Sequence, residues 1–394
     1  MNPMETVNYD VAVCGAGVAG CAAAIAAARS GMKTVLIEKQ CLLGGLATSG
    51  LIYIYLPICD GKGHKVMGGI PEEMIKRCTA YSPFDLPESW GGPAGADNGR
   101  GYKPKVRYES CFSPAGFSLE LDKMLLEAGV DLWLDTMITG CEMEGKRLTA
   151  IHAANSSGMV KITAGCFIDA TGGAYVAQQA GCRVHRTENF VSPWVVGFSE
   201  EKTTFCLHEK LGVHPLGALT EEYTVQDCST GKSITRFMRD CWDVIRKNYD
   251  KLSPEERKKN FPVQLPSMPQ LRKIAAVESF RNIEDSDCGK HFEDSIGVAG
   301  DWRGSLTTVW ETPFGSLVPR DAEGLFTAGR CIGSIGKSAW EIYRVIPAAA
   351  MTGEAAGTAA AQAVRDNCST HRIDVEKLRK TLADNKCILY YPHF

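Results

Sequence analysis

The sequence predicts an α/β protein built on a parallel sheet, with an inserted α+β segment. An apolar run at 9–14 leads into a glycine turn at 15–20 and then into an Ala-rich helical segment. Two further apolar runs end in glycine turns, at 166–173 and 324–330, and the stretch 190–312 contains an amphipathic helical pattern among alternating runs. Short buried strands that alternate with helices are typical of parallel sheets. Runs of alternating apolar and polar residues beside an amphipathic helix predict an α+β layer.

Length and composition favour a globular protein with two domains. The chain has 394 residues with 44% hydrophobic and 23% charged residues, which excludes disordered, collagen-like and coiled-coil proteins. The formal net charge is −3, so there is no basic surplus to attract a polyphosphate. We therefore expect no nucleic-acid partner.

The cysteine spacing and the first residues bear on the compartment that we expect for the protein. None of the 16 cysteines forms a Cys-x-x-Cys pair, and no Cys/His spacing is typical of a zinc or iron–sulfur site. The first residues lack the pattern of a leader, and charged residues or glycines interrupt every long apolar run. We expect a soluble, cytoplasmic protein without a metal site or a membrane segment.

The N-terminal segment reads as one strand–helix–strand unit. Residues 9–14 (YDVAVC) form the first predicted strand, residues 21–30 the helix and residues 34–37 the second strand. Gly31 stands where a helix commonly ends. The spacing predicts a Rossmann-like half-domain.

Three glycines and one glutamate give this unit a dinucleotide-binding pattern. Gly15 permits the tight turn, Gly17 lets the backbone approach a pyrophosphate, and Gly20 lets helix and strand pack closely. The helix N-terminus adds free N–H groups and a partial positive charge. Glu38, at the end of the second strand, would accept hydrogen bonds from a ribose and repel a 2′-phosphate, which favours FAD or NAD over NADP.

Glycine-rich turns recur along the chain. GGLATSG at 44–50 follows the second strand, and further strand-to-glycine turns lie at 166–173 and 324–330. Glycines and small residues let the backbone lie against a flat ligand. We expect one extended ligand that contacts all of these turns.

These motifs together resemble the FAD-dependent oxidoreductases of the two-dinucleotide-binding flavoprotein superfamily, which includes fumarate reductase flavoproteins and p-hydroxybenzoate hydroxylase. The nearest resemblance is to an FAD-dependent oxidoreductase family whose members are often labelled xanthan-lyase-like. GAGVAG at 15–20, GGLATSG at 44–50, IDATGG at 168–173 and the block 313–362 carry the resemblance. It implies FAD as the cofactor and says little about the substrate.

The resemblance also implies roles for individual residues. The pyrophosphate would lie at the first glycines, the adenosine ribose at Glu38 and Lys39, and the isoalloxazine along the 44–48 turn. Arg330 stands where many relatives have an acidic residue, and Leu46 stands where enzymes with covalent flavin have a histidine, so we expect noncovalent FAD. The predicted FAD-binding residues are Gly15, Ala16, Gly17, Ala19, Gly20, Glu38, Lys39, Gly44, Gly45, Leu46, Thr48, Ala170, Thr171, Gly172, Gly329, Arg330, Ile346 and Ala348.

A helix is expected to begin at Pro347, with candidate catalytic residues just before it. Proline suits the first helical position, and the resemblance implies that the dipole of this helix stabilises negative charge on the reduced flavin. The same Ala-rich segment also fits an ordinary core helix. Arg344 is the candidate for holding an anionic or carbonyl oxygen of a substrate, and Tyr343 the candidate for proton transfer. A salt bridge between Arg344 and Glu341 is the structural alternative.

The glycine turns and the two insertions between them suggest a discontinuous domain organisation. Residues 1–57, 111–189 and 313–394 would form the FAD-binding domain. Residues 58–110 and 190–312 would form a substrate or cap domain over the flavin.

The predicted function is hydride transfer between flavin N5 and a small polar substrate, such as a hydroxy or amino acid, a sugar derivative or an unsaturated carboxylate. Two alternatives remain: a net non-redox elimination or isomerisation through transient oxidation, and an electron-transfer subunit that needs a partner. The sequence has no second dinucleotide motif and no redox Cys-x-x-Cys. A separate, unidentified electron donor or acceptor is therefore expected.

Overall fold

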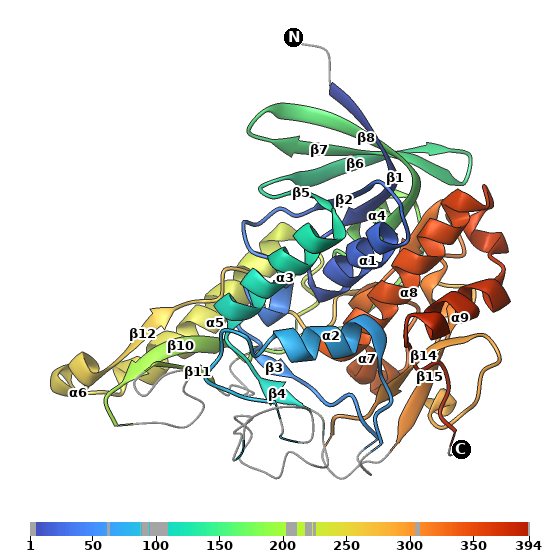
Figure 1. Cartoon of the computed structure of the whole chain (residues 1–394). Coiled ribbons are helices and arrows are strands. Elements are labelled where there is room, and N and C mark those ends of the chain that lie inside the picture. The colour runs from blue at the N-terminus through green and yellow to red at the C-terminus, as the bar shows by residue number, and fades with distance from the viewer. Residues whose placement is uncertain are drawn as a thin grey trace.

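A seven-stranded sheet organises the chain. The computed structural model describes residues 5–60, 64–86, 88, 94, 109–201, 211–216, 223, 226–303 and 308–392. The strand order of the sheet is β5-β2-β1-β8-β7-β6, with β16 also paired to β8. This mixed α/β architecture confirms the predicted fold class (Figure 1).

The parallel part of the sheet holds the predicted strand–helix–strand unit. Strands β1 (Glu5–Cys14) and β2 (Thr34–Ile37) are parallel, with β5 (Asp131–Trp133) beyond β2. On the other side of β1, the long strand β8 (Gly158–Asp169) runs parallel to it and pairs at its end with β16 (Leu325–Thr327). The carboxyl ends of these strands therefore meet at one edge, where open α/β sheets bind ligands.

An antiparallel meander extends the sheet and was missing from the sequence prediction. Strands β6 (Met137–Glu144) and β7 (Arg147–Asn155) pair antiparallel with each other, and β7 pairs antiparallel with β8. The three strands form the top of the molecule in Figure 1. Strand β8 thus joins the meander to the parallel layer.

Two helices far apart in the sequence pack against each other beside the sheet. Helix α1 (Val18–Arg29) contacts helix α8 (Ile346–Arg365), which is buried along almost its whole length (Figure 1). A Cβ added at Gly353 or at Gly357 of α8 would come 2.2 Å from a backbone oxygen of α1. Only glycine allows this approach, and α8 begins one residue before the predicted Pro347.

The segment between 190 and 312 contains a small separate sheet. Strands β11 (Leu211–Pro215), β10 (Trp194–Ser199) and β12 (Asn260–Gln264) form a three-stranded antiparallel sheet. Helix α5 (Gly231–Asp250) contains the predicted amphipathic helix, and α6 (Pro254–Lys259) follows it. The domain boundaries stay a prediction.

In the part of the chain that the structure describes, the remaining strands form three two-stranded sheets, β3-β4, β13-β9 and β14-β15, and the remaining helices are spread along the sequence. They are β3 (Ile54–Tyr55), α2 (Gly69–Arg77), β4 (Ser110–Cys111), α3 (Pro114–Ala128), α4 (Tyr175–Gln179), β9 (Val184–Arg186), β13 (Ala275–Val277), β14 (Ser295–Gly300), β15 (Val309–Pro313), α7 (Lys337–Tyr343) and α9 (Val375–Asp384).

Candidate functional site

The predicted glycine turns lie together around one cleft at the carboxyl edge of the parallel strands. The turn after β1 contacts the turn after β2, since the Gly44 amide donates to the Ala16 carbonyl at 2.8 Å. The cleft is lined by Gly15, Gly17, Val18, Ala19, Glu38, Lys39, Gln40, Gly44, Gly45, Leu46, Ala47, Ala170, Thr171, Gly172, Tyr175, Met268, Pro269, Leu271, Ile274, Ala328, Gly329, Arg330, Arg344, Ile346 and Ala349.

Each of the three glycines in the first turn occupies its position for a different structural reason. Gly15 has φ +96°, and a Cβ there would come 2.9 Å from the Ala170 carbonyl oxygen. A Cβ at Gly20 would lie 1.7 Å from the Gly15 oxygen, so only glycine fits between helix and turn. Gly17 lines the cleft, and a Cβ there would meet no protein atom within 4 Å. The backbone at Gly17 is thus bare toward the cleft.

Glu38 fixes the turn between β1 and α1. Its Oε2 accepts the Ala16 N–H at 2.7 Å, and its Oε1 accepts the Gln40 N–H at 2.9 Å. Gly17, the N-cap of α1, has no side chain to satisfy the first-turn N–H groups of the helix. These amides leave a positive dipole end at the cleft, next to a carboxylate.

Arg330 covers one side of the cleft. Its guanidinium donates to the Leu271 carbonyl, and a Cβ at Gly172 would lie 2.5 Å from its Nη2. Burial lowers the pKa of Arg330 to about 10, which still leaves it charged at neutral pH. At this position, where the family resemblance implies an acidic residue, the cleft therefore carries a partly buried positive charge.

A hollow beside Glu38 extends the cleft toward the meander of β6, β7 and β8. This hollow of about 470 Å³ shares Gly15, Glu38, Lys39, Thr171 and Tyr175 with the cleft. Its far wall, which sequence reasoning missed, comprises Thr136, Met137 and Ile138 at the start of β6. Residues 268–274, on the return from the small sheet, were also missed, because no motif marks them.

Four of the predicted cofactor-binding residues do not reach the cleft. The Ala16 and Ala348 side chains are buried in the core, and Gly20 packs against Gly15. Thr48 is also buried, and its hydroxyl donates to the Leu43 carbonyl within its own turn. The dinucleotide motif and the family resemblance placed these residues in the prediction. Gly20 packs the helix against the turn, as expected from the motif, and the side chains of Ala16, Thr48 and Ala348 are buried.

Tyr343, the candidate for proton transfer, does not line the cleft. It is fully buried, its hydroxyl shares a hydrogen bond of 3.0 Å with Thr312 Oγ1, and it lies 3.3 Å from the Glu311 carbonyl to which it donates. Burial raises the pKa of Tyr343 far above its usual value. Successive residues of a helix point in different directions, so Tyr343 faces the core while Arg344 lines the cleft.

Arg344 lines the cleft, and its contact with a substrate stays a prediction. It is the C-cap of α7, and its guanidinium stands 5.7 Å from the centre of the Trp302 ring. Its buried Nε has no hydrogen-bond partner in the described structure. Burial lowers the pKa of Arg344. The Glu341 carboxylate lies 3.5 Å from Arg303 Nη1, and this ion pair takes the place of the alternative pair with Arg344.

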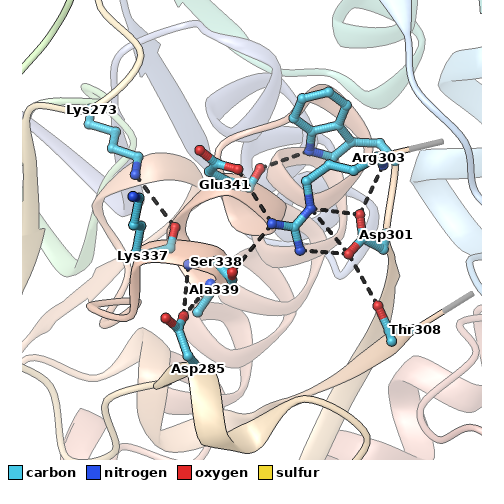
Figure 2. A network of polar contacts seen from close by, with 10 residues as sticks. Lys273, Asp285, Asp301, Arg303, Thr308, Lys337, Ser338, Ala339 and Glu341 are labelled. Atoms are coloured by element: carbon cyan, nitrogen blue, oxygen red, sulfur yellow. Dashed lines mark hydrogen bonds and ion pairs between the residues drawn. The ribbon is translucent and has the colours of Figure 1, made fainter. Parts of the chain in front are cut away.

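A polar network holds α7, and thereby Arg344, in place (Figure 2). Asp285 Oδ1 accepts the Ser338 and Ala339 N–H groups at 2.7 and 3.0 Å, at the start of the helix. Arg303 connects the buried carboxylate of Asp301 (2.6 Å) with Glu341 at the end of the helix. Figure 2 shows Arg303 reaching between these two acids.

A second cavity adjoins the cleft at Arg344. Its volume is about 790 Å³, and Arg344 lines both spaces. The cavity is lined by His185, Arg186, Thr187, Glu188, Asn189, Phe190, Arg272, Lys273, Ile335, Lys337, Trp340, Glu341 and Arg344. Neither the cavity nor Arg272 and Lys273 was predicted.

The described residues contain no group of three or more His, Cys, Asp or Glu placed to hold a metal ion. Within the same residues, no helix has both the length and the apolar character needed to cross a bilayer.

The cleft geometry agrees with the comparison to known families. The chain matches the family described as FAD dependent oxidoreductase over residues 10–204 and 275–382. The chain belongs to this family. FAD is accordingly the cofactor of this oxidoreductase, and the unmatched segment 205–274 contains α5, α6 and β12.

One curated relative and one solved structure show how far the likeness extends. The digeranylgeranylglycerophospholipid reductase of Picrophilus torridus is 28% identical over 176 residues, which are 42% of this chain and 40% of that protein. The match thus spans less than half of the relative's length. A geranylgeranyl bacteriochlorophyll reductase-like protein from Thermoplasma acidophilum has a TM-score of 0.51 at 16% identity, over 97% of this chain and 84% of that one. This second likeness concerns the fold alone.

Proposed function

We propose that FAD lies along the cleft with its pyrophosphate over Gly17 and the N-terminus of α1. The bare backbone at Gly17 and the open first turn of α1 support this placement, because phosphates bind at such amide-rich helix ends. A side chain at Gly17 would occupy the space that the phosphates need. The extra hollow at β6 gives the adenosine a place beyond Glu38.

The proposed placement gives the other cleft residues clear tasks. Glu38 uses one lone pair of each oxygen for backbone amides, and its remaining lone pairs would accept the ribose hydroxyls. The isoalloxazine would lie toward Gly44, Gly45 and Leu46. Leu46 offers no nucleophile for a covalent bond, which supports noncovalent binding.

The N-terminus of α8 supports the redox role of this end of the cleft. Ile346 and Ala349, in the first turn of α8, line the cleft, and the N-cap Val345 supplies no side-chain hydrogen bond to that turn. A helix N-terminus favours nearby negative charge. This dipole would stabilise the charge that FAD gains on reduction.

The function that this geometry supports best is hydride transfer between FAD and an organic substrate held in the second cavity. The single observation that carries this proposal is that Arg344 lines both the cleft and the cavity. Bound FAD supplies the hydride acceptor or donor, and Arg344 would orient an oxygen of the substrate toward it through its planar fork of donors.

The substrate is proposed from the cavity lining. The Arg and Lys side chains of the cavity lining support a polar group on the substrate. The small polar substrate predicted from the sequence would carry such a group. The curated relative is named for a large lipid, which gives no support for a small substrate. A cavity of about 790 Å³ with aromatic walls also leaves room for a larger body. A separate molecule or protein would complete the electron balance.

The test begins with FAD-loaded protein under anaerobic conditions, mixed with candidate metabolites while the flavin absorbance is followed. Lasting bleaching by a substrate, weakened in Arg344→Met, is the expected result. Transient bleaching with full recovery would replace this proposal by the internal oxidation–reduction cycle. A protein that binds no FAD would overturn it altogether.

A further inference from the structure

The second cavity carries more positive charge than its own acids compensate. Five of its lining residues are Arg or Lys and two are Glu. One of these glutamates, Glu341, is engaged by Arg303, and the other, Glu188, lies at the exposed rim. Within the described residues, no carboxylate forms an ion pair with Arg272 or Arg344, and Glu341 acts on Arg344 only as a nearby negative charge.

Arg272 is the cation that the fold satisfies least. Its buried Nη1 has no hydrogen-bond partner within the described residues, and its Nη2 reaches only the Ser192 carbonyl, at 3.5 Å. Burial and the nearby charge of Arg344 lower the pKa of Arg272 to about 10. An arginine that is desolvated beside a second arginine is unfavourable unless an anion joins them.

Asn189 fixes the backbone that presents Arg272 and Lys273. Its Oδ1 accepts the N–H groups of both residues, at 2.8 and 2.9 Å, and its Nδ2 donates to the Lys273 carbonyl. Asn189 is itself buried and pairs through its backbone with Gln226. The next residue, Phe190, places its ring 4.8 Å from the Arg272 guanidinium. Both cations are thus held before any ligand binds, which is how a binding site lowers the entropy cost of binding.

Lys273 extends the same surface toward α7. Figure 2 shows its side chain reaching toward the Lys337 carbonyl, which lies 3.5 Å from its Nζ. Its Nζ also stands 5.8 Å from the centre of the Trp340 ring. Trp340 is 2% exposed, and its indole N–H has no partner in the described part of the chain. The cavity therefore combines cations with an aromatic wall.

We propose that Arg272 and Lys273, together with Arg344, form a subsite for an oxyanion of the substrate, a carboxylate or a phosphate, whose carbon body lies against Phe190 and Trp340. The proposal rests on the proposed function for the placement of the reacting carbon beside FAD. It adds the substrate class, namely organic anions. Planar guanidinium groups bind both oxyanions through paired hydrogen bonds, and the aromatic walls bury the attached carbon skeleton.

The experiment uses three probes of similar shape: benzoate, phenyl phosphate and the neutral benzamide. Each is titrated into the FAD-loaded protein by calorimetry, with tryptophan fluorescence as a second signal. At least one anion is expected to bind about tenfold or more tightly than benzamide. The tighter of the two anions identifies the oxyanion, whereas two anions no tighter than benzamide would overturn the proposal.

Variants separate the subsite from general electrostatics. Arg272→Met is expected to weaken anion binding about tenfold, while benzamide binding stays unchanged. Arg236→Met, on the exposed face of α5, is the matched control because it removes the same charge from a residue that does not line the cavity. Equal losses in both variants would refute the subsite. In the anion-free protein, Arg272→Met is expected to leave the melting temperature unchanged or higher, since it removes an unsatisfied buried charge.

The two proposals fail in different ways. Anion titrations of protein without FAD still report on Arg272 and Lys273 if FAD does not bind. FAD binding with normal flavin spectra but no anion preference would remove the subsite and leave the proposed FAD placement intact.

Discussion

Gly17→Ala is the sharpest perturbation of the proposed cofactor placement. Gly17 has φ −65° and ψ 174°, a conformation that alanine adopts without strain. An added Cβ would meet no protein atom within 4 Å, so the folded chain accommodates it. In the FAD complex, the same Cβ would stand between the α1 amides and the pyrophosphate.

The magnitudes follow from these two environments. An N-cap change from glycine to alanine costs about 1 kcal/mol. The stiffer unfolded chain offsets about 0.4–1 kcal/mol of this cost, so stability should change by less than about 1 kcal/mol. Displacing the pyrophosphate weakens two charge-assisted hydrogen bonds worth about 1.5 kcal/mol each. The dissociation constant of FAD should therefore rise about 100-fold.

The assay pairs thermal unfolding of the FAD-free protein with titration of FAD by flavin fluorescence. Gly140→Ala in β6 is the control, because its Cβ would meet only the His152 ring, at 3.8 Å, away from the cleft lining. A Gly17→Ala protein that keeps wild-type FAD affinity would refute the placement over α1. A protein that loses FAD only because it melts earlier would show that the cavity reasoning at Gly17 is wrong.

Three further outcomes are expected. Glu38→Gln should weaken FAD binding about tenfold and lower stability by about 1–2 kcal/mol, measured by titration and urea unfolding, because charge-assisted bonds to backbone amides become neutral ones. Tyr343→Phe should leave turnover unchanged and cost about 1 kcal/mol, since Thr312 loses its partner; a fall in turnover at normal stability would restore a chemical role. Burial raises the pKa of Glu354 to about 7 from 4.5. Between these two values the folded chain keeps the proton that the unfolded chain releases, so wild-type stability falls as pH rises from about 4.5 to 7. Glu354→Gln, which can still accept the Ile70 N–H (2.8 Å in the wild type), should therefore gain stability relative to wild type from about pH 5 to pH 8, by at most about 3 kcal/mol; parallel pH profiles would contradict this.

The sequence predicts best the parts whose physics is local. The first strand, helix and second strand fold where their apolar runs and glycines place them, with β2 at the predicted residues 34–37. Turn glycines such as Gly15 are visible because a positive φ and a close backbone neighbour both demand this residue. The start of α8 is marked by Pro347 for a similarly local reason.

The parts that depend on distant segments were not predictable. Arg272 and Lys273 belong to an irregular stretch with no motif, and their backbone N–H groups are held by Asn189, more than eighty residues earlier. The sequence does not distinguish the directions of Tyr343 and Arg344, because they are neighbours at the end of one helix. In the structure, Tyr343 shares a hydrogen bond with Thr312 in the core and Arg344 lines the cleft. Thr48 resembled a flavin contact, but its own turn takes its hydroxyl.

The glycine contact between α1 and α8 has a consequence for the order in which the nascent chain becomes functional. The two helices are separated by more than three hundred residues, and both place their first turns at the cleft. A ribosome-bound chain that has already exposed its N-terminal glycine turn still lacks the opposite wall until α8 has left the exit tunnel. If FAD lies in the proposed place, its capture during synthesis therefore has to wait until α8 has been made, and a premature stop before α8 would leave a fragment that lacks this wall of the cleft.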